Sequence, residues 1–544
     1  MNSSELEYTS LESLVALTLV YSHTRYFHPS ANGISCDWEQ FLKNAVTVFC
    51  KSHSEATLLK KLKSTFNSLV DIRFIREGCN SEAVSVTQID NEKKQYWQHF
   101  GVFLGDSDGC YRSELISHNS WIKQQPDQLN ASEWIRLNVL KGWDVVIPLF
   151  GDNTTTANTI QKPTHELKPV QSNKAILLLS DTILSWSILY HFYPYPEYSE
   201  IRELNTLKQA LSMALDGNNQ CLNYLTHALN DGHAHVVETP YSEHRRAVFP
   251  FSWEVIDNQV VITKADGPFL SGDIIESVNG ERINLLMTEC KPRFSGKPEF
   301  CQYLAYRDVL TTHLKRGSVF TIKRNGNSFE INTETIKSEI EQKMDFELLE
   351  DNIVYFDLTK NSVENLLPKL SELNQYRGVI FDLRGYPIDA DILLPHLLTS
   401  SDQHESWMRV PIATNPNHHM SKFESYGWGL ETAQPHIDIA VCFLTNIKAV
   451  SYSESILAIV KHYNLGTIIG ENTAGANGDV HEIRLMNGGA MYFTGMKVSL
   501  LDGSQLHCVG IPPDIEVKQT FERLKYGNYD EIIEAGINHI KSVT

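Results

Sequence analysis

The sequence predicts a multidomain protein of the α/β class, and three observations support this. The chain has 544 residues and a mass of 61.8 kDa, which is enough for several packed cores. Hydrophobic residues make up 42% of it and no long low-complexity tract interrupts it, so most of the chain should fold. From about residue 343 onward, short apolar runs alternate with helical patterns. This alternation is typical of a parallel sheet that is covered on both faces.

Five segments follow one another along the chain. We expect a helical segment over residues 1–83, a small β-rich module over 84–170, a second helical segment over 171–249, a β-rich segment over 250–335 and an α/β domain over 336–544. In the α/β domain, "NIVYFDL", "GVIFDLRG" and "IDIAVCFLTN" are the expected strands, while "VENLLPKLSEL" and "SESILAIVKHY" are the expected helices. Asn325 and Gly326 predict a hairpin turn in the β-rich segment.

The two helical segments resemble each other, which indicates a weak internal repeat. At an offset of 165 residues, Phe27 falls on Phe192, and the pattern L-K-x-A from Leu42 falls on the one from Leu207. The two copies then diverge. Asp71 matches Asp231, but Arg73 occupies the place of His233. We therefore expect the first copy to be structural and the second to be specialised.

Composition excludes some functions. The formal net charge is −19, and no basic run with interleaved aromatic residues is present, so nucleic acid is not expected as a partner. The nine cysteines are scattered without a C-x-x-C pair, which predicts reduced thiols. The stretch "LESLVALTLVY" predicts an amphipathic helix, and no run approaches the roughly 20 apolar residues of a membrane span. We expect a soluble chain, cytoplasmic as it stands or periplasmic or extracellular if a signal peptide was removed.

Ser451 follows the strand pattern "IDIAVCFLTN" and opens a helix. A hydroxyl at this place lies near unpaired backbone N–H groups and the positive end of the helix dipole, which favours developing negative charge. Serine is also a preferred N-cap residue, and position alone favours that interpretation. Ser453 and Ser455 lie in the same stretch, so position does not select one of the three serines.

The hexapeptide "DGHAHV" places His233 and His235 beside Asp231. The pair could bind a metal, act as a base, or lie on the surface without a role. Metal binding would need a third ligand, and no H-E-x-x-H pattern or carboxylate cluster accompanies the pair. Composition alone favours two surface histidines, whereas an activated serine would require one of them as its base.

Four linked motifs carry a resemblance to a known family. The stretches "GVIFDLRGYP", "AVSYSES", "IIGENTAGANGDV" and "GIPPDIEV" occur in the order of the tail-specific, or C-terminal processing, serine peptidases. The stretch from Gly272 to Gly280 resembles the PDZ domain, whose groove captures extended peptides. The resemblance covers roughly residues 170–520. It implies a catalytic domain of the ClpP/crotonase-like α/β fold, preceded by a helical cap and a PDZ-like domain.

The resemblance also implies roles for single residues. The family nucleophile falls on Ser451, and the oxyanion hole falls on the backbone N–H groups of Gly385 and Tyr452. One branch of the family uses a lysine as general base, but Ala476 stands at that position here. The branch that resembles tricorn protease uses a histidine near the end of the cap instead, and His233 matches it.

The chain departs from that branch in the residues that orient the histidine. The resemblance implies a serine before the histidine and a glutamate before the last motif, and these places hold Gly232 and, approximately, His507. The residues that could substitute for them are Asp231, Glu454, Glu471 and Asp479.

We therefore expect a serine peptidase that forms an acyl-enzyme on Ser451, with His233 as general base and without a cofactor or metal. Its partner would be a peptide or protein substrate, bound in part by the PDZ-like groove. The alternative is a binding protein that keeps the peptidase fold without turnover. The first copy, with Arg73 in place of His233, should carry no catalytic group.

Overall fold

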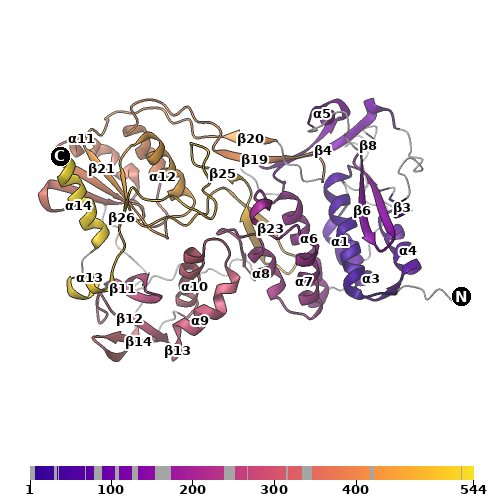
Figure 1. The fold of residues 1–544 in the computed structure, drawn as a ribbon, viewed down its shortest axis with the longest axis horizontal. Helices are drawn as coiled ribbons and strands as arrows, with labels where there is room; N and C mark the ends of the chain where they lie inside the picture. Colours follow the sequence, from indigo (N-terminus) through magenta and orange to yellow (C-terminus); the bar gives the residue numbers. More distant parts are fainter. Residues whose placement is uncertain are drawn as a thin grey trace.

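The structure is a computed structural model and has an elongated shape (Figure 1). It describes residues 7–29, 34, 36–67, 69–70, 72–78, 89–104, 109–124, 133–152, 173–237, 251–265, 267–313, 317–333, 346–416, 422–527 and 530–544. Asp71, the expected counterpart of Asp231, lies outside these residues. In Figure 1 the N-terminal elements lie at one end and the C-terminal sheet with α14 at the other.

Two sets of three helices pack side by side in the N-terminal and central parts of the molecule. They are α1 (Ser10–Phe27), α3 (Trp38–Phe49), α4 (Glu55–Phe66), α6 (Lys174–Phe192), α7 (Leu204–Leu215) and α8 (Gln220–His227). Helix α1 begins at a capping box in which Thr9 and Glu12 satisfy each other's backbone N–H groups. Its residues are buried on almost all sides, so the expectation of an amphipathic helix is wrong.

Helix α6 lies in the shared core of the two helical sets. Among the described residues it is the one helix that length and composition would allow to cross a membrane, and most of it is buried inside the protein. This corrects the expectation that no run comes near such a length. Burial of this extent is typical of a core helix.

The C-terminal sheet has six strands in the order β16-β17-β18-β21-β22-β26. Their bounds are Glu347–Leu348, Ile353–Asp357, Gly378–Asp382, Ala440–Thr445, Thr467–Gly470 and Ile515–Glu516, and all but β16 run parallel. Phe381 packs in the same core as Ile456 of α12 (Tyr452–Tyr463), whereas Ile380 packs with Ile537 of α14 (Glu531–Val543). The predicted parallel sheet with two covered faces is therefore confirmed.

The expected helix "VENLLPKLSEL" is broken into short turns. These are the 3-10 turns η7 (Val363–Asn365) and η8 (Leu367–Lys369) and the short helix α11 (Leu370–Leu373). Pro368 lies inside this stretch and supplies no backbone N–H, so a continuous helix is not formed there.

The segment 251–333 forms an antiparallel sheet in the order β10-β11-β12-β14-β15. The bounds are Phe251–Ile256, Gln259–Ala265, Ile274–Val278, Ser318–Arg324 and Asn327–Thr333, with β13 (Glu281–Arg282) paired to β12. Helices α9 (Ile283–Cys290) and α10 (Pro298–His313) pack against it. Asn325 and Gly326 both have positive φ and connect β14 to β15, so the predicted hairpin turn is confirmed.

The strands of residues 73–152 divide between two sheets, of which one is shared with the C-terminal part of the chain. The strands are β3 (Arg73–Arg76), β4 (Lys94–Phe100), β5 (Arg112–Ser117), β6 (Trp134–Leu140), β7 (Trp143–Pro148) and β8 (Gly151–Asp152). Strand β4 pairs with β19 (Met408–Ala413), which also pairs with β20 (Phe423–Tyr426). In Figure 1, β19 and β20 extend from the C-terminal sheet toward β4. The expected separate module over 84–170 is thus joined to the C-terminal part by a shared sheet.

Candidate active site

Ser451 lies at the start of α12, after the loop that follows β21. Its backbone has φ 56° and ψ −110°, a conformation that costs a non-glycine residue about 1–3 kcal/mol. The backbone N–H of Ser451 donates to the carbonyl of Ala476 at 2.8 Å. The surrounding loops therefore hold Ser451 in a strained turn between strand and helix, as a nucleophile elbow does.

The other two serines of this stretch point into the protein. Ser453 donates to the carbonyl of Gly385, and Ser455 donates to Asn477 at 3.3 Å. Both residues are buried, whereas Ser451 is half-buried. The structure thus separates Ser451 from Ser453 and Ser455, which the sequence did not.

The carboxylate of Glu454 binds groups at the start of α12 and in the neighbouring loop. Its carboxylate is fully buried and accepts from the Thr473 hydroxyl at 2.5 Å and from the backbone N–H groups of Gly475 at 2.7 Å and Ala476 at 3.0 Å. It also accepts from the N–H of Ser451 at 3.3 Å. Burial raises the pKa of Glu454 to about 7, although these four hydrogen bonds lower it. Glu454 therefore anchors the loop beside Ser451, and no hydrogen bond in the described part of the chain joins it to His233.

His233 lies in the turn between α8 and β9 (His235–Val237), and one residue links its side chain to a buried carboxylate. Its Nδ1 lies 2.9 Å from the hydroxyl of Thr494, at the end of β24 (Ala490–Thr494). That hydroxyl donates to Asp231 at 2.8 Å, and Asp231 is fully buried. Since the single proton of Thr494 goes to Asp231, the Thr494 oxygen accepts from Nδ1–H of His233. In this arrangement Nε2 of His233 carries no proton and can accept one.

The remaining bonds of Asp231 fix the same turn. Its carboxylate also accepts from the N–H of Thr494 at 2.7 Å and from the N–H of His233 at 3.0 Å. Its own N–H donates to the Ser295 hydroxyl at 2.9 Å. Burial lowers the pKa of His233, and the negative charge of Asp231 opposes this shift. The imidazole is therefore held neutral at neutral pH.

His235 does not join His233 in a shared site. Its side chain is exposed, its Nδ1 lies 2.8 Å from the carbonyl of His233, and its ring stacks on Tyr492 with centroids 4.9 Å apart. Among the described residues, no group of three His, Cys, Asp or Glu side chains could hold a metal ion.

A close contact joins the serine and histidine loops at Gly232. A Cβ added to Gly232 would lie 2.7 Å from Cβ of Ala476 and 3.1 Å from Cδ1 of Phe300, so no side chain fits at position 232. Ala476 in turn accepts the hydrogen bond of the Ser451 N–H. The two departures from the family pattern, Gly232 and Ala476, are thus in contact, and each leaves room for the other.

The expected oxyanion donors differ from each other. The N–H of Tyr452 belongs to the first turn of α12, where backbone N–H groups have no partner within the helix. The N–H of Gly385 donates to the carbonyl of Leu383 at 2.8 Å instead of pointing to an empty position. The peptide at Gly385 would therefore have to turn before this N–H could bind a substrate oxygen.

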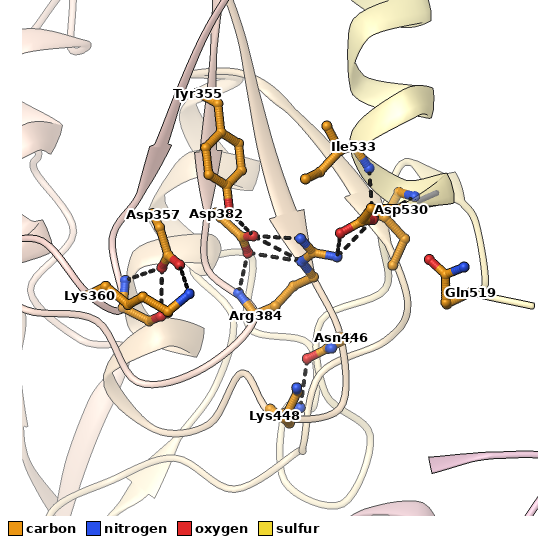
Figure 2. A network of polar contacts seen from close by, with 12 residues as sticks. Tyr355, Asp357, Lys360, Asp382, Arg384, Asn446, Lys448, Gln519, Asp530 and Ile533 are labelled. Atoms are coloured by element: carbon orange, nitrogen blue, oxygen red, sulfur yellow. Dashed lines mark hydrogen bonds and ion pairs between the residues drawn. The ribbon is translucent and has the colours of Figure 1, made fainter. Parts of the chain in front are cut away.

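The loop that contains Gly385 is anchored by a buried ion network (Figure 2). Arg384 contacts Asp382 at the end of β18, with the shortest distance at 2.6 Å, and Asp530 at 2.8 Å. Tyr355 donates to Asp382 at 2.8 Å, and Asp530 caps α14. The network therefore holds both the backbone N–H and the guanidinium of Arg384, the residue before Gly385.

His507, which stands where the family has its glutamate, lies near the site without a hydrogen bond to His233 in the described structure. Its ring stacks on Tyr195 with centroids 3.9 Å apart and an interplanar angle of 8°. The residue that contacts the imidazole is Thr494, which the sequence analysis missed. It lies 261 residues from His233, and no local motif marks it.

Comparison with known proteins identifies the domain that contains Ser451. Residues 352–517 match the model of peptidase family S41. The chain contains an S41 peptidase domain. An uncharacterized protein of Chlamydia muridarum (strain MoPn / Nigg) is 27% identical over 184 residues, which is 31% of this chain and 28% of that protein. The present chain therefore spans well under two thirds of this curated relative.

Two solved structures resemble the fold around the S41 domain. Mature CPAF complexed with lactacystin matches with a TM-score of 0.52 and 13% identity, over 69% of this chain and 100% of that chain. A serine-to-alanine mutant of CPAF matches with a TM-score of 0.53 and 13% identity, over 68% of this chain and 98% of that chain. At such identities the likeness concerns the fold, which is a mixed α/β multidomain fold.

Proposed function

We propose that this chain is a serine peptidase in which Ser451 is the nucleophile and His233 the general base. Nε2 of His233 would take the proton of the Ser451 hydroxyl while its oxygen attacks the peptide carbonyl. The proton would then pass to the leaving amine as the C–N bond breaks, which leaves an acyl ester on Ser451. Water activated by the same imidazole would release the acid and restore the serine.

The observation that carries this proposal is the chain of contacts from His233 to Thr494 to Asp231. A general base must present an unprotonated nitrogen, and it is more effective when the other nitrogen is held by a fixed acceptor. Thr494 supplies that acceptor, and the buried carboxylate of Asp231 would stabilise the imidazolium that forms. Here Thr494 and Asp231 would take the roles for which the family resemblance had implied a serine and a glutamate.

We propose further that the substrate is an extended peptide and that the PDZ-like segment takes part in its capture. Several contacts connect this segment to the site loops, and two of them involve lysines. Glu254 of β10 pairs with Lys448, three residues before Ser451, at 2.5 Å. Lys297 donates to the carbonyl of Thr473 at 3.0 Å. Movement of the segment on peptide binding would therefore act directly on the loops beside Ser451.

One observation favours the second candidate, a peptide-binding protein without turnover. The Gly385 N–H is bound to the carbonyl of Leu383, so one of the two expected oxyanion donors is occupied in this conformation. If the peptide at Gly385 cannot turn, attack at the carbonyl would lose one of two donors, a loss of about 10²–10³ in kcat.

The test is hydrolysis of a peptide mixture of varied length and C-terminal sequence, with products identified by mass spectrometry. The intact protein and the Ser455→Ala control, which removes a buried hydroxyl from the same helix, should give the same products. Ser451→Ala should give none. Cleavage that persists in Ser451→Ala would contradict the proposed nucleophile, and peptide binding without products in the intact protein would support the second candidate.

A further inference from the structure

Two parts of the chain build the same elements in the same order. In the N-terminal unit (residues 7–152), helices α1, α3 and α4 precede β3. In the C-terminal unit (residues 173–544), helices α6, α7 and α8 precede β9. The hairpins β4–β5 and β6–β7 and the short strand β8 then correspond to β19–β20, β23 (Val480–Arg484) with β24, and β25 (Lys497–Val498). The similarity thus extends well beyond the repeated helices.

The strand pairing repeats as well. Strand β3 pairs with β7 as β9 pairs with β24, and β8 pairs with β4 as β25 pairs with β19. In the first unit, Arg73 lies opposite Val146. In the second unit, His235 lies opposite Tyr492. His233 precedes His235 by two residues, Thr494 follows Tyr492 by two, and the His233 ring lies within hydrogen-bond distance of the Thr494 hydroxyl. With Arg73 matched to His233 as in the sequence, this register places Val146 at the position of Thr494.

The two units face each other about an approximate twofold axis. The ring centroids of Tyr26 and Phe192 lie 5.2 Å apart, and those of Phe27 and His191 lie 5.0 Å apart. At the repeat offset of 165 residues, each of these pairs is the counterpart of the other. The equivalent strands β4 and β19 pair with each other in antiparallel orientation. Reciprocal contacts of this kind are what a pair of identical subunits makes across a twofold axis.

The N-terminal unit lacks the parts that would make a second site. Only α5 (His118–Gln124) and nine further residues lie between β5 and β6, whereas β21, α12 and β22 lie between β20 and β23. Too few residues are present for a strand, the helix and a second strand. Arg73 and Val146 supply neither an imidazole nor a hydroxyl.

The same unit contacts the strands that hold the relay. The hydroxyl of Tyr111 donates to the carbonyl of Asp479 at 2.9 Å. The ring centroids of Tyr111 and His481 lie 3.9 Å apart. A Cβ added to Gly495, the residue after Thr494, would lie 2.5 Å from the Tyr111 oxygen. Tyr111 thus packs on the end of β24 and on the start of β23.

We propose that the N-terminal unit is a degenerate second copy that serves as a partner subunit within one chain. It occupies the face that two C-terminal units would share, and through Tyr111 it positions the strand end that carries Thr494. The chain then needs no second copy and has one site. The positioning role rests on the proposed function, whereas the partner role does not depend on catalysis.

The partner role is tested by cutting the full-length protein at a specific protease sequence inserted within residues 153–172, which connect the two units. After the cut, native mass spectrometry should find both pieces in one particle with the mass of one chain, with unchanged circular dichroism. Separation of the pieces with the larger one still folded would overturn the proposal. So would loss of folding on cutting, because a partner held by its interface stays bound without a covalent link.

The positioning role is tested with Tyr111→Ala and Tyr111→Phe, with Arg73→Ala as the matched control in the same unit. Tyr111→Ala should lower kcat/KM by about tenfold or more, since small displacements of catalytic groups are costly, and Tyr111→Phe should recover most of it. The Ser451→Ala protein should show the same particle mass as the intact chain. Equal activity of Tyr111→Ala and Arg73→Ala would overturn the positioning role and leave the nucleophile assignment unaffected.

Discussion

At the scale of single residues, Ser451 is held in a backbone conformation that L residues rarely adopt. The positive φ is maintained by the hydrogen bonds of its N–H to Ala476 and Glu454. Strain of this kind persists where the surrounding structure determines the backbone, and it is frequent at functional sites.

Two substitutions at Ser451 distinguish the effect of its strained backbone from the effect of its hydroxyl. Ser451→Gly should be more stable than Ser451→Ala by about 1 kcal/mol, because glycine adopts positive φ without steric cost. Both variants should be inactive. Urea denaturation measures the difference, and a Ser451→Ala protein as stable as Ser451→Gly would indicate that the turn is not strained.

The pKa of His233 should determine how kcat/KM depends on pH. Burial lowers its pKa from the ordinary value of 6.5, so the imidazole stays neutral and able to accept a proton to lower pH than a free histidine. We therefore expect kcat/KM to rise with pH along a limb whose midpoint lies below 6.5. A midpoint above that value in the pH profile of the intact enzyme would contradict this environment for the base.

Substitutions at Thr494 test the link that this residue makes between His233 and Asp231. Thr494→Val keeps the shape and installs the residue that the N-terminal unit has at Val146, but it removes the acceptor for His233 and the donor to Asp231. We expect kcat to fall by roughly 10–100-fold, a part of what a general base contributes. Thr494→Ser should retain most of the activity. Equal rates for the valine and serine variants, measured on the same peptide, would exclude the relay.

At the scale of elements, the strands and helices of the S41 domain follow from local sequence, and the contacts between distant elements do not. The apolar runs around Phe381 and Ile469 and the turn at Asn325 are encoded by their own residues. Ser451, His233 and Asp231 were marked by motifs, so their neighbourhood could be anticipated. Thr494 was not, because its contact with His233 depends on the pairing of β9 with β24, strands more than 200 residues apart.

The turn before β9 gives a prediction at this scale. Gly232→Ser restores the family pattern in sequence, but its side chain would collide with Ala476 and Phe300. We expect the change to displace His233 and lower kcat by at least about tenfold instead of improving it. Ala476→Gly should relieve the closer of the two collisions, that with Cβ of Ala476, and partial recovery of activity in the double variant is the measurement. A Gly232→Ser protein with unchanged kcat would show that the contact does not constrain the turn.

At the scale of the whole molecule, the repeated helices are visible in the sequence, whereas the pattern of residues 84–170 predicts a separate module. The pairing of β4 with β19 and the repeat of the strands could not be anticipated, because strand partners are determined by tertiary packing instead of local pattern. Gly232, the neighbour of His233, lies beside Ala476, whose carbonyl accepts from the N–H of Ser451. The central claim is that Ser451 and His233 act as one catalytic unit.

Covalent labelling by a fluorophosphonate probe, followed by peptide mapping, tests that claim most directly. In the intact protein we predict one adduct per chain, on Ser451. The adduct should be absent in Ser451→Ala, reduced by about 10²-fold or more in rate in His233→Ala, and nearly unchanged in His235→Ala, since a general base contributes on the order of 10²–10⁴. A folded protein that stays unlabelled, or that labels equally fast in His233→Ala and His235→Ala, would contradict the account.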